Sequence, residues 1–284
     1  MIGPCVLPAG YADRPRWSAE VGGARGTVVT VSDQAAPTDP LHPLLDLPGV
    51  PDAVRAARTA VDEVHRHPAN RRGWPATAAE ASVRAARASA ALDGGDPEIP
   101  AAGEVTDPVL AGALRVAESI GLLLTTWQRA PLQALARLHV LAAADLVPVA
   151  QADSLGRPRP AAGVSARLDL LAGLVAGKTE VPGPVLAAVV HGELLALAPF
   201  EAGNGVVARA AARLTAIATG LDPKGLAVPE VFYLRRRDEY LEAARAFATG
   251  DSDGVRRWLL FCCDAVQAGA KEGAGIADAV ASPA

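Results

Sequence analysis

The chain has 284 residues, of which 50% are apolar and only 4% aromatic, and its formal net charge at pH 7 is -4. Alanine, leucine and valine dominate the apolar residues, which favours closely packed helices over sheets. The acidic balance gives no electrostatic reason to expect binding to nucleic acid or to an anionic membrane.

The first 50 residues are rich in proline and glycine, so we expect an irregular arm at 1–50, a helical domain at 51–275 and a tail at 276–284. A β-branched run at Thr27–Val31 predicts at most a short strand in the arm. The start of the chain lacks the basic and apolar segments of a secretory signal. No stretch approaches the roughly 18 apolar residues of a membrane span. We therefore expect a cytoplasmic protein.

Apolar residues recur at helical spacing through most of the remaining chain, and prolines and glycines indicate where helices begin and end. The predicted helices cover 51–67, 75–92, 108–127, 131–145, 165–175, 182–197, 204–219, 229–248 and 251–269. Between 148 and 160 the chain is polar and proline-rich, which predicts an exposed loop of the kind that often borders a site. The sequence as a whole predicts an all-α fold.

The segment APFEAGNG at Ala198–Gly205 separates two strongly helical stretches. Its residues Gly203, Asn204 and Gly205 allow successive backbone N–H groups to converge at a helix N-terminus, a geometry that binds anions. Arg209 follows one turn later, on the side that would face a phosphate held by those groups. Spacing alone leaves a second interpretation open, in which the glycines only separate two helices and Arg209 is solvated.

This segment resembles the signature of the Fic (Fido) family, H-P-F-x-[DE]-G-N-G-R-x-x-R, in which a helix, a loop and a second helix hold the phosphates of a nucleotide. The matching positions are Pro199, Phe200, Gly203, Asn204, Gly205 and Arg209. The stretches Val189–Leu195 and Asp238–Ala243 also resemble parts of the family, and the resemblance covers roughly residues 89–266. It implies a Fic-like helical bundle and relates the chain to protein adenylyltransferases, the enzymes of AMPylation.

The sequence SAALDG at Ser89–Gly94 resembles the inhibitory motif [ST]-x-x-x-E-[GN] that precedes many Fic cores, with aspartate in place of glutamate. In the family the acidic residue pairs with the second arginine of the signature and blocks productive nucleotide binding. The resemblance therefore implies that Ser89, Asp93 and Gly94 form an inhibitory motif, with Asp93 paired to Arg209. A solvated aspartate at an ordinary helix end is the alternative.

Three chemically active positions of the family signature are changed here. Ala198 stands in place of the catalytic histidine that takes the proton from the attacking hydroxyl, Ala202 in place of the acidic magnesium ligand, and Val206 in place of the first arginine. Loss of a general base typically costs roughly 10²- to 10⁴-fold in rate. We therefore expect a pseudoenzyme rather than a conventional adenylyltransferase, with no assured ligand for magnesium and no metal site.

Two side chains are candidates for a replacement base. Glu201 lies next to the position of the missing acid, although a solvated carboxylate is the favoured interpretation. His191 precedes Ala198 by nearly two helical turns, roughly 10 Å along the axis, which favours a packed structural histidine. For His65 and His67, at alternate positions of a helix, solvated side chains are favoured over shared metal binding because such positions point apart.

We expect a regulatory or scaffolding pseudoenzyme that can bind a nucleotide such as ATP, or another phosphate ligand, through the loop glycines, Asn204 and Arg209. An active nucleotidyl or phosphoryl transferase of altered mechanism, with Glu201 or His191 recruited, is the alternative. A protein-interaction module without a ligand is the third hypothesis. The expected partners are a nucleotide, another protein and a second copy of the chain in a homodimer, but neither nucleic acid nor a membrane.

Overall fold

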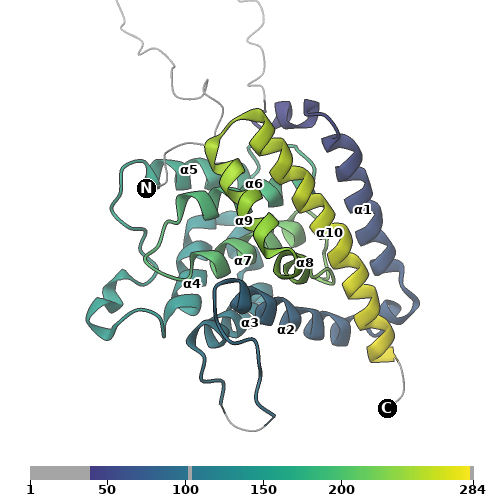
Figure 1. Cartoon of the computed structure of the whole chain (residues 1–284), viewed down its shortest axis with the longest axis horizontal. Helices are drawn as coiled ribbons and strands as arrows, with labels where there is room; N and C mark the ends of the chain where they lie inside the picture. Colours follow the sequence, from purple (N-terminus) through teal and green to yellow (C-terminus); the bar gives the residue numbers. More distant parts are fainter. Residues whose placement is uncertain (1–38, 102–103, 282–284) are drawn as a thin grey trace, which may run out of the picture.

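The computed structural model describes residues 39–101 and 104–281 (Figure 1). Within these ranges the chain forms ten α-helices, three short 3-10 helices and no strand, which confirms the predicted all-α fold. The α-helices are α1 (Val50–Arg66), α2 (Trp74–Leu92), α3 (Pro108–Arg129), α4 (Pro131–Ala143), α5 (Val164–Val175), α6 (Gly183–Leu197), α7 (Asn204–Ala218), α8 (Pro229–Arg235), α9 (Arg237–Thr249) and α10 (Ser252–Ala281). The 3-10 helices are His42–Asp46, Pro68–Arg71 and Val149–Ser154.

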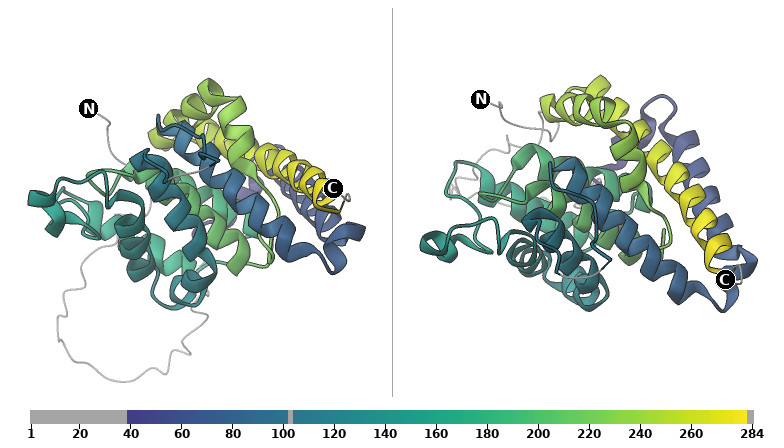
Figure 2. Two further views of the ribbon diagram at one scale, coloured as in Figure 1. Left: turned by 90° about the horizontal axis from the view of Figure 1, so that it is seen from below. Right: turned by 60° about the horizontal axis from the view of Figure 1, so that its bottom comes forward.

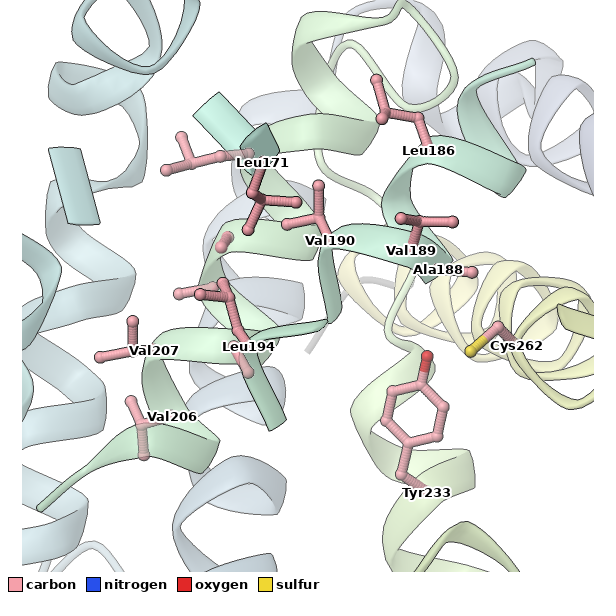
Figure 3. Close-up of a cluster of buried hydrophobic side chains, with 14 of the residues drawn as sticks. Leu171, Leu186, Ala188, Val189, Val190, Leu194, Val206, Val207, Tyr233 and Cys262 are labelled. Carbon is pink, nitrogen blue, oxygen red and sulfur yellow. The ribbon is translucent and has the colours of Figure 1, made fainter. Parts of the chain in front are cut away.

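Helix α6 forms the centre of the core. It is apolar on all sides, and twelve of its fifteen residues are buried. Such a helix must be covered on every face, and α6 packs against α5, α7, α9 and α10. Figure 3 shows Val190 and Leu194 of α6 between Val207 of α7 and the pair formed by Tyr233 of α8 and Cys262 of α10.

The remaining helices surround this centre. Helices α1 and α10 run side by side along one flank of the molecule (Figures 1 and 2). On another side α2 packs against α3 and α8, and α3 packs against α4 and α7. The end of α2 thereby reaches the start of α7, where the sequence places the predicted site.

The prediction of one helix over 229–248 is wrong. Arg236 has φ of -119° and ψ of 43°, outside the helical region, so that α8 ends at Arg235 and α9 begins at Arg237. No proline or glycine marks this break in the sequence. Tertiary packing of the two short helices therefore decides it, rather than a local stop signal.

The predicted end of the last helix at Gly269 is also wrong, because α10 continues to Ala281 and includes most of the predicted tail at 276–284. Gly269 serves close packing instead. A Cβ atom there would lie 2.5 Å from the backbone nitrogen of Pro229, and the N–H of Val228 donates to the carbonyl oxygen of Gly269 at 3.0 Å. The glycine allows the chain before α8 to lie against α10.

His65 is not solvated, contrary to the prediction. Its Nε2 atom lies 2.7 Å from Oδ1 of Asp222, and its side chain is only 15% exposed. Asp222 also accepts two backbone N–H groups from the connection between α7 and α8. His67 lies with its Nε2 atom 3.3 Å from Oδ1 of Asp278. These contacts attach α1 to distant parts of the chain, which no local pattern indicates.

Most of the predicted arm at 1–50, including the possible strand at Thr27–Val31, lies outside the described residues. Its described end contacts the domain. The carboxylate of Asp39 accepts the hydroxyl of Thr179 at 2.8 Å and the backbone N–H of Glu180 at 2.6 Å. This contact holds the entry to α1 beside the start of α6.

One described helix, α3, is long and apolar enough to cross a membrane by length and composition, with a mean hydropathy of 1.5 over its most apolar 18 residues. The helix contains Arg115 and Glu118, so it is not an uninterrupted apolar run of the kind expected for a membrane span. In the structure α3 packs against α2, α4 and α7, and 33% of that window is buried. A core helix of a folded domain passes the same test.

Gly112 lies where α3 and α4 approach closely, and a Cβ atom there would collide with the carbonyl oxygen of Ala142. We expect Gly112→Ala to lower the free energy of unfolding by roughly 1–3 kcal/mol, the usual cost of overpacking, as measured by urea denaturation. Gly275→Ala is the control, because Gly275 is exposed on α10 and its Cβ position has no neighbour within 4 Å. The free energy of unfolding of Gly275→Ala should rise by up to about 1 kcal/mol. Equal effects of the two substitutions would contradict the close packing of α3 on α4.

Candidate functional site

The loop between α6 and α7 has a shape maintained by its own backbone and by one side chain. Ala198 adopts a left-handed φ of 41°, and Gly203, which precedes α7, has φ of 68°. Asn204 closes the loop: its Oδ1 atom accepts the N–H of Phe200 at 2.9 Å, and its Nδ2 atom donates to the carbonyl oxygen of Phe200 at 2.7 Å. The side-chain amide of Asn204 is thus used within the loop, whereas the phosphate-binding role predicted for its backbone N–H stays a prediction.

Phe200 anchors the loop in the core. Its side chain is buried, and its ring stacks on His139 with the centroids 4.0 Å apart and an angle of 6° between the planes. The Nδ1 atom of His139 accepts the backbone N–H of Gly156 at 2.8 Å. Burial lowers the pKa of His139 to about 4, so that the ring is neutral near pH 7. His139 thereby joins the loop after α6 to the polar segment at 148–160.

The polar segment borders the site through Arg159. The guanidinium donates to the carbonyl oxygens of Ala198 at 2.7 Å and Leu197 at 3.0 Å, and the backbone N–H of Arg159 donates to Pro199 at 2.8 Å. Carbonyls at the end of a helix lack intrahelical donors, and a cation there also interacts favourably with the helix dipole. Arg159 was missed by sequence reasoning, because a single arginine in a polar loop carries no distinctive pattern.

The end of α2 places Asp93 at the start of α7, after which Gly94 turns the chain with a left-handed φ of 87°. Oδ2 of Asp93 accepts the backbone N–H of Val206 at 3.1 Å, and Oδ1 accepts Nη2 of Arg209 at 2.7 Å. A Cβ atom at Gly205 would collide with this carboxylate, so a larger residue there would displace Asp93 from this position. The structure thus contains the predicted contact between Asp93 and Arg209, and a carboxylate lies where the sequence predicts an anion.

Arg209 is enclosed by its partners, and its side chain is only 3% exposed. Nε donates to the hydroxyl of Ser89 at 2.8 Å, Nη2 also donates to the carbonyl oxygen of Ser89 at 2.9 Å, and Nη1 donates to the hydroxyl of Tyr240 at 3.3 Å. Burial opposes the positive charge, but the adjacent Asp93 carboxylate outweighs it and raises the pKa of Arg209. The interpretation of Arg209 as a solvated side chain is therefore wrong.

Tyr240 connects Arg209 to His191, whose Nε2 atom lies 2.9 Å from the tyrosine hydroxyl. The His191 side chain is 1% exposed, and its ring lies within 5.3 Å of the ring of Tyr233 and 5.1 Å of the ring of Trp258, measured between centroids. Burial, together with the charge of Arg209, lowers the pKa of His191 well below its usual 6.5. The environment is that of a neutral, packed histidine.

Two of the changed positions of the signature, 206 and 202, carry side chains without a polar group. Val206 is 3% exposed within the main apolar core, where burial of a charged side chain is costly unless it is paired. Ala202 has no ligand atom to offer a magnesium ion, and the neighbouring Glu201 is exposed. Among the described residues, no group of three or more histidine, cysteine, aspartate or glutamate side chains could hold a metal ion. The side chain at position 202 therefore cannot serve as a magnesium ligand.

Three solved structures with a similar fold are those of Fic proteins. No protein-family model matches the sequence, and no curated protein does. A Fic family protein from Desulfovibrio desulfuricans G20 has a similar structure, with a TM-score of 0.63 and 18% identity over 79% of this chain and 74% of that chain. A fragment of Fic-1 from C. elegans has a TM-score of 0.61 and 18% identity over 82% of this chain and 74% of that chain.

A variant of the same C. elegans fragment, with one glutamate replaced by glycine, has a TM-score of 0.62 and 17% identity over 84% of this chain and 74% of that chain. Similarity at this level of identity shows the fold. The chain therefore has the all-helical Fic fold, as its resemblance to the family signature implies. The roles predicted for the residues of the loop and of the end of α2 stay predictions.

The left-handed backbone at Ala198 gives a test of the loop geometry. A residue with a Cβ atom pays roughly 1–2 kcal/mol in this region, whereas glycine does not, although glycine loses more entropy on folding. We expect Ala198→Gly to raise the free energy of unfolding by roughly 0.5–1 kcal/mol and the β-branched Ala198→Val to lower it, both measured by urea denaturation. A clear loss of stability in Ala198→Gly would contradict this conformation.

Proposed function

We propose that the protein is a catalytically degenerate Fic-fold protein with a regulatory or scaffolding role, and that its phosphate site is closed by its own carboxylate. One observation carries the proposal. Asp93 accepts both the N–H of Val206, at the start of α7, and the guanidinium of Arg209. These are the two kinds of donor that a phosphate at a helix N-terminus uses.

The closed state follows from the competition of two anions for one set of donors. A phosphate oxygen at the start of α7 needs the donors that Asp93 now occupies, and two negative charges in that position repel each other. A phosphate ligand therefore binds only when Asp93 withdraws. The Asp93 side chain is 25% exposed, so the carboxylate can move toward water, whereas Arg209 stays enclosed at 3%. Movement of the Asp93 carboxylate thus controls access to the site, and the Arg209 guanidinium is the group that stays in place to bind the phosphate.

Loss of transfer chemistry follows from the residues that surround this site. Proton removal from an attacking hydroxyl needs a base within hydrogen-bonding distance, and Ala198 has none to offer. His191 is buried beside Tyr240, and Glu201 is exposed on the loop. No contact in the described structure favours either as a replacement, so an active transferase of altered mechanism is the less supported function.

A ligand that competes with Asp93 gives the protein a switch without catalysis. Nucleotides such as ATP, CTP or GTP carry the phosphates that the start of α7 can bind, and so does inorganic pyrophosphate. Release of Asp93 would remove its contacts with Val206 and Arg209 while Ser89 still holds Arg209, so the change would be confined to the surface near residues 93–101. A protein partner that recognises this surface would then respond to the ligand. This is the regulatory or scaffolding role that we propose.

The test is thermal unfolding of the wild type and of Asp93→Ala with each of ATP, CTP, GTP, CDP-choline and pyrophosphate, with and without magnesium. We expect little stabilisation of the wild type and a clear rise in Tm for Asp93→Ala with at least one ligand. Ligand at 100 times its Kd stabilises by about 2.7 kcal/mol, which corresponds to several degrees. Magnesium should add little, because Ala202 supplies no ligand.

Asp96→Ala is the matched control, since Asp96 is an exposed aspartate in the same connection and accepts the N–H of Glu98 rather than any group of α7. It should behave as the wild type does. Arg209→Met in the Asp93→Ala background should abolish the ligand-induced shift without leaving an unpaired buried charge. If no ligand changes the Tm of Asp93→Ala, the chain has no phosphate site of this kind. An interaction module without a ligand would then be the better account. Transfer of a labelled nucleotide to protein would instead support an active transferase.

A further inference from the structure

A cavity of about 50 Å³ lies between the helices and borders Arg209 but not Asp93. Its walls come from α1, α6, α7, α8 and α10 and from the connection between α7 and α8. Figure 3 shows two lining residues, Tyr233 and Cys262, whose hydroxyl and thiol are hydrogen-bonded to each other. Many of the other lining side chains are small and apolar, among them Ala187, Ala188, Ala212, Ala216 and Val266. The cavity is therefore a mainly apolar space beside a buried guanidinium.

Glu230 brings to this wall a polar atom that the protein leaves without a partner. The residue lies in the first turn of α8 and is 4% exposed. Its Oε2 atom is fully buried, and among the described residues no group donates a hydrogen bond to it. Nη1 of Arg213 lies 3.8 Å away, beyond hydrogen-bonding distance. A buried carboxylate oxygen without a donor is costly, so a donor from a bound molecule would be favourable here.

The charges around the cavity favour a neutral ligand over an ion. Two guanidinium groups, Arg209 and Arg213, and two carboxylates, Asp222 and Glu230, border it, so an added charge of either sign would meet like charges. A hydroxyl group is neutral and both donates and accepts. It can donate to Oε2 of Glu230 and accept from Nη1 of Arg213, which carries two hydrogens and donates to the carbonyl oxygen of Ala227 at 3.1 Å.

The size of the cavity limits the ligand to a few atoms. A dry cavity of roughly 150 Å³ holds benzene, so a space of about 50 Å³ has room for roughly three non-hydrogen atoms. We propose that the cavity binds a small neutral alcohol of the size of ethanol. Its hydroxyl group lies between Glu230 and Arg213, and its alkyl group packs against the alanines of α6 and α7. The tightest Kd to expect for so small a ligand is about 1 mM.

This alcohol site is separate from the proposed phosphate site, although Arg209 borders both. Neither Asp93 nor Val206 lines the cavity, so an alcohol binds there without displacing the Asp93 carboxylate. Glu230 also borders a second cavity of about 30 Å³, between α2, α3 and α7. The two cavities can be filled independently, because Ala216 of α7 lines only the first and Ala117 of α3 lines only the second.

The first test is a titration of the full chain with ethanol, followed by NMR of isotope-labelled alanine methyl groups. We expect the signals of the alanines that line the cavity to shift and to saturate with a Kd of about 1–10 mM. Ala216→Leu fills the cavity and should weaken binding at least about tenfold. Ala117→Leu is the matched control, since both alanines are half-buried on their helices, and its Kd should stay within about twofold of the wild type. Shifts that do not saturate in the wild type, or an unchanged Kd in Ala216→Leu, would overturn the proposal.

The second test concerns the hydroxyl group. Glu230→Gln keeps the shape of the side chain but removes its charge, and it should weaken ethanol binding about tenfold because a charged acceptor forms the stronger hydrogen bond. The urea midpoint of this variant reports whether its fold is intact. Ethanethiol tests the same point without a substitution: its S–H group is a weak donor, so it should bind the wild type at least about tenfold more weakly than ethanol. Equal binding of the two ligands, or a wild-type Kd for ethanol in a folded Glu230→Gln, would contradict the assigned contact.

Discussion

The structure of the site depends on one constraint: a permanently charged guanidinium, that of Arg209, lies where water scarcely reaches. A buried charge is costly unless it is paired and hydrogen-bonded. The fold meets this requirement from two separate segments, with Ser89 and Asp93 at the end of α2 and Tyr240 on α9. Polar contacts of Arg209 therefore join α2 to α7 in addition to apolar packing. Removal of any one partner leaves the guanidinium undersatisfied.

This arrangement separates the shape of the loop from the chemistry it could perform. The shape depends on the left-handed backbone of Ala198 and Gly203 and on the amide of Asn204, all of which are present. The chemistry would depend on side chains at 198, 202 and 206, which are alanine, alanine and valine. A loop of this shape can offer backbone N–H groups to an anion without a base or a metal ligand. In this protein the anion that receives one of them is Asp93.

Local signals in the sequence predicted most helices, because prolines and glycines lie at their ends and apolar residues follow the helical period. The exceptions are instructive. Arg236 interrupts a helix without either signal, and Gly269 allows a close approach to Pro229 instead of ending α10. The resemblance to a known signature indicated the contact between Asp93 and Arg209, which are 116 residues apart. The patterns alone indicated only a possible anion site.

Other contacts, in the site and elsewhere in the fold, could not be derived from local patterns. Arg159 reaches the end of α6 from a loop 38 or 39 residues away, and His65 of α1 reaches Asp222 over 157 residues. Such pairs depend on how helices pack in three dimensions, whereas spacing along the chain reports only the faces of a single helix. Tyr240 shows the same limit: its segment resembles the family, yet its hydroxyl contact with Arg209 became evident only from the fold.

The most direct test of the central claim is a double-mutant cycle in the free energy of unfolding, with Asp93→Ala, Arg209→Met and the double variant. Because the two side chains form an ion pair in which one member is almost completely buried, we predict a coupling energy of roughly 1–3 kcal/mol. Each single variant would lose stability, and the double variant would lose much less than their sum. A coupling energy near zero would show that Asp93 does not hold the donors at the start of α7, and would contradict the closed state.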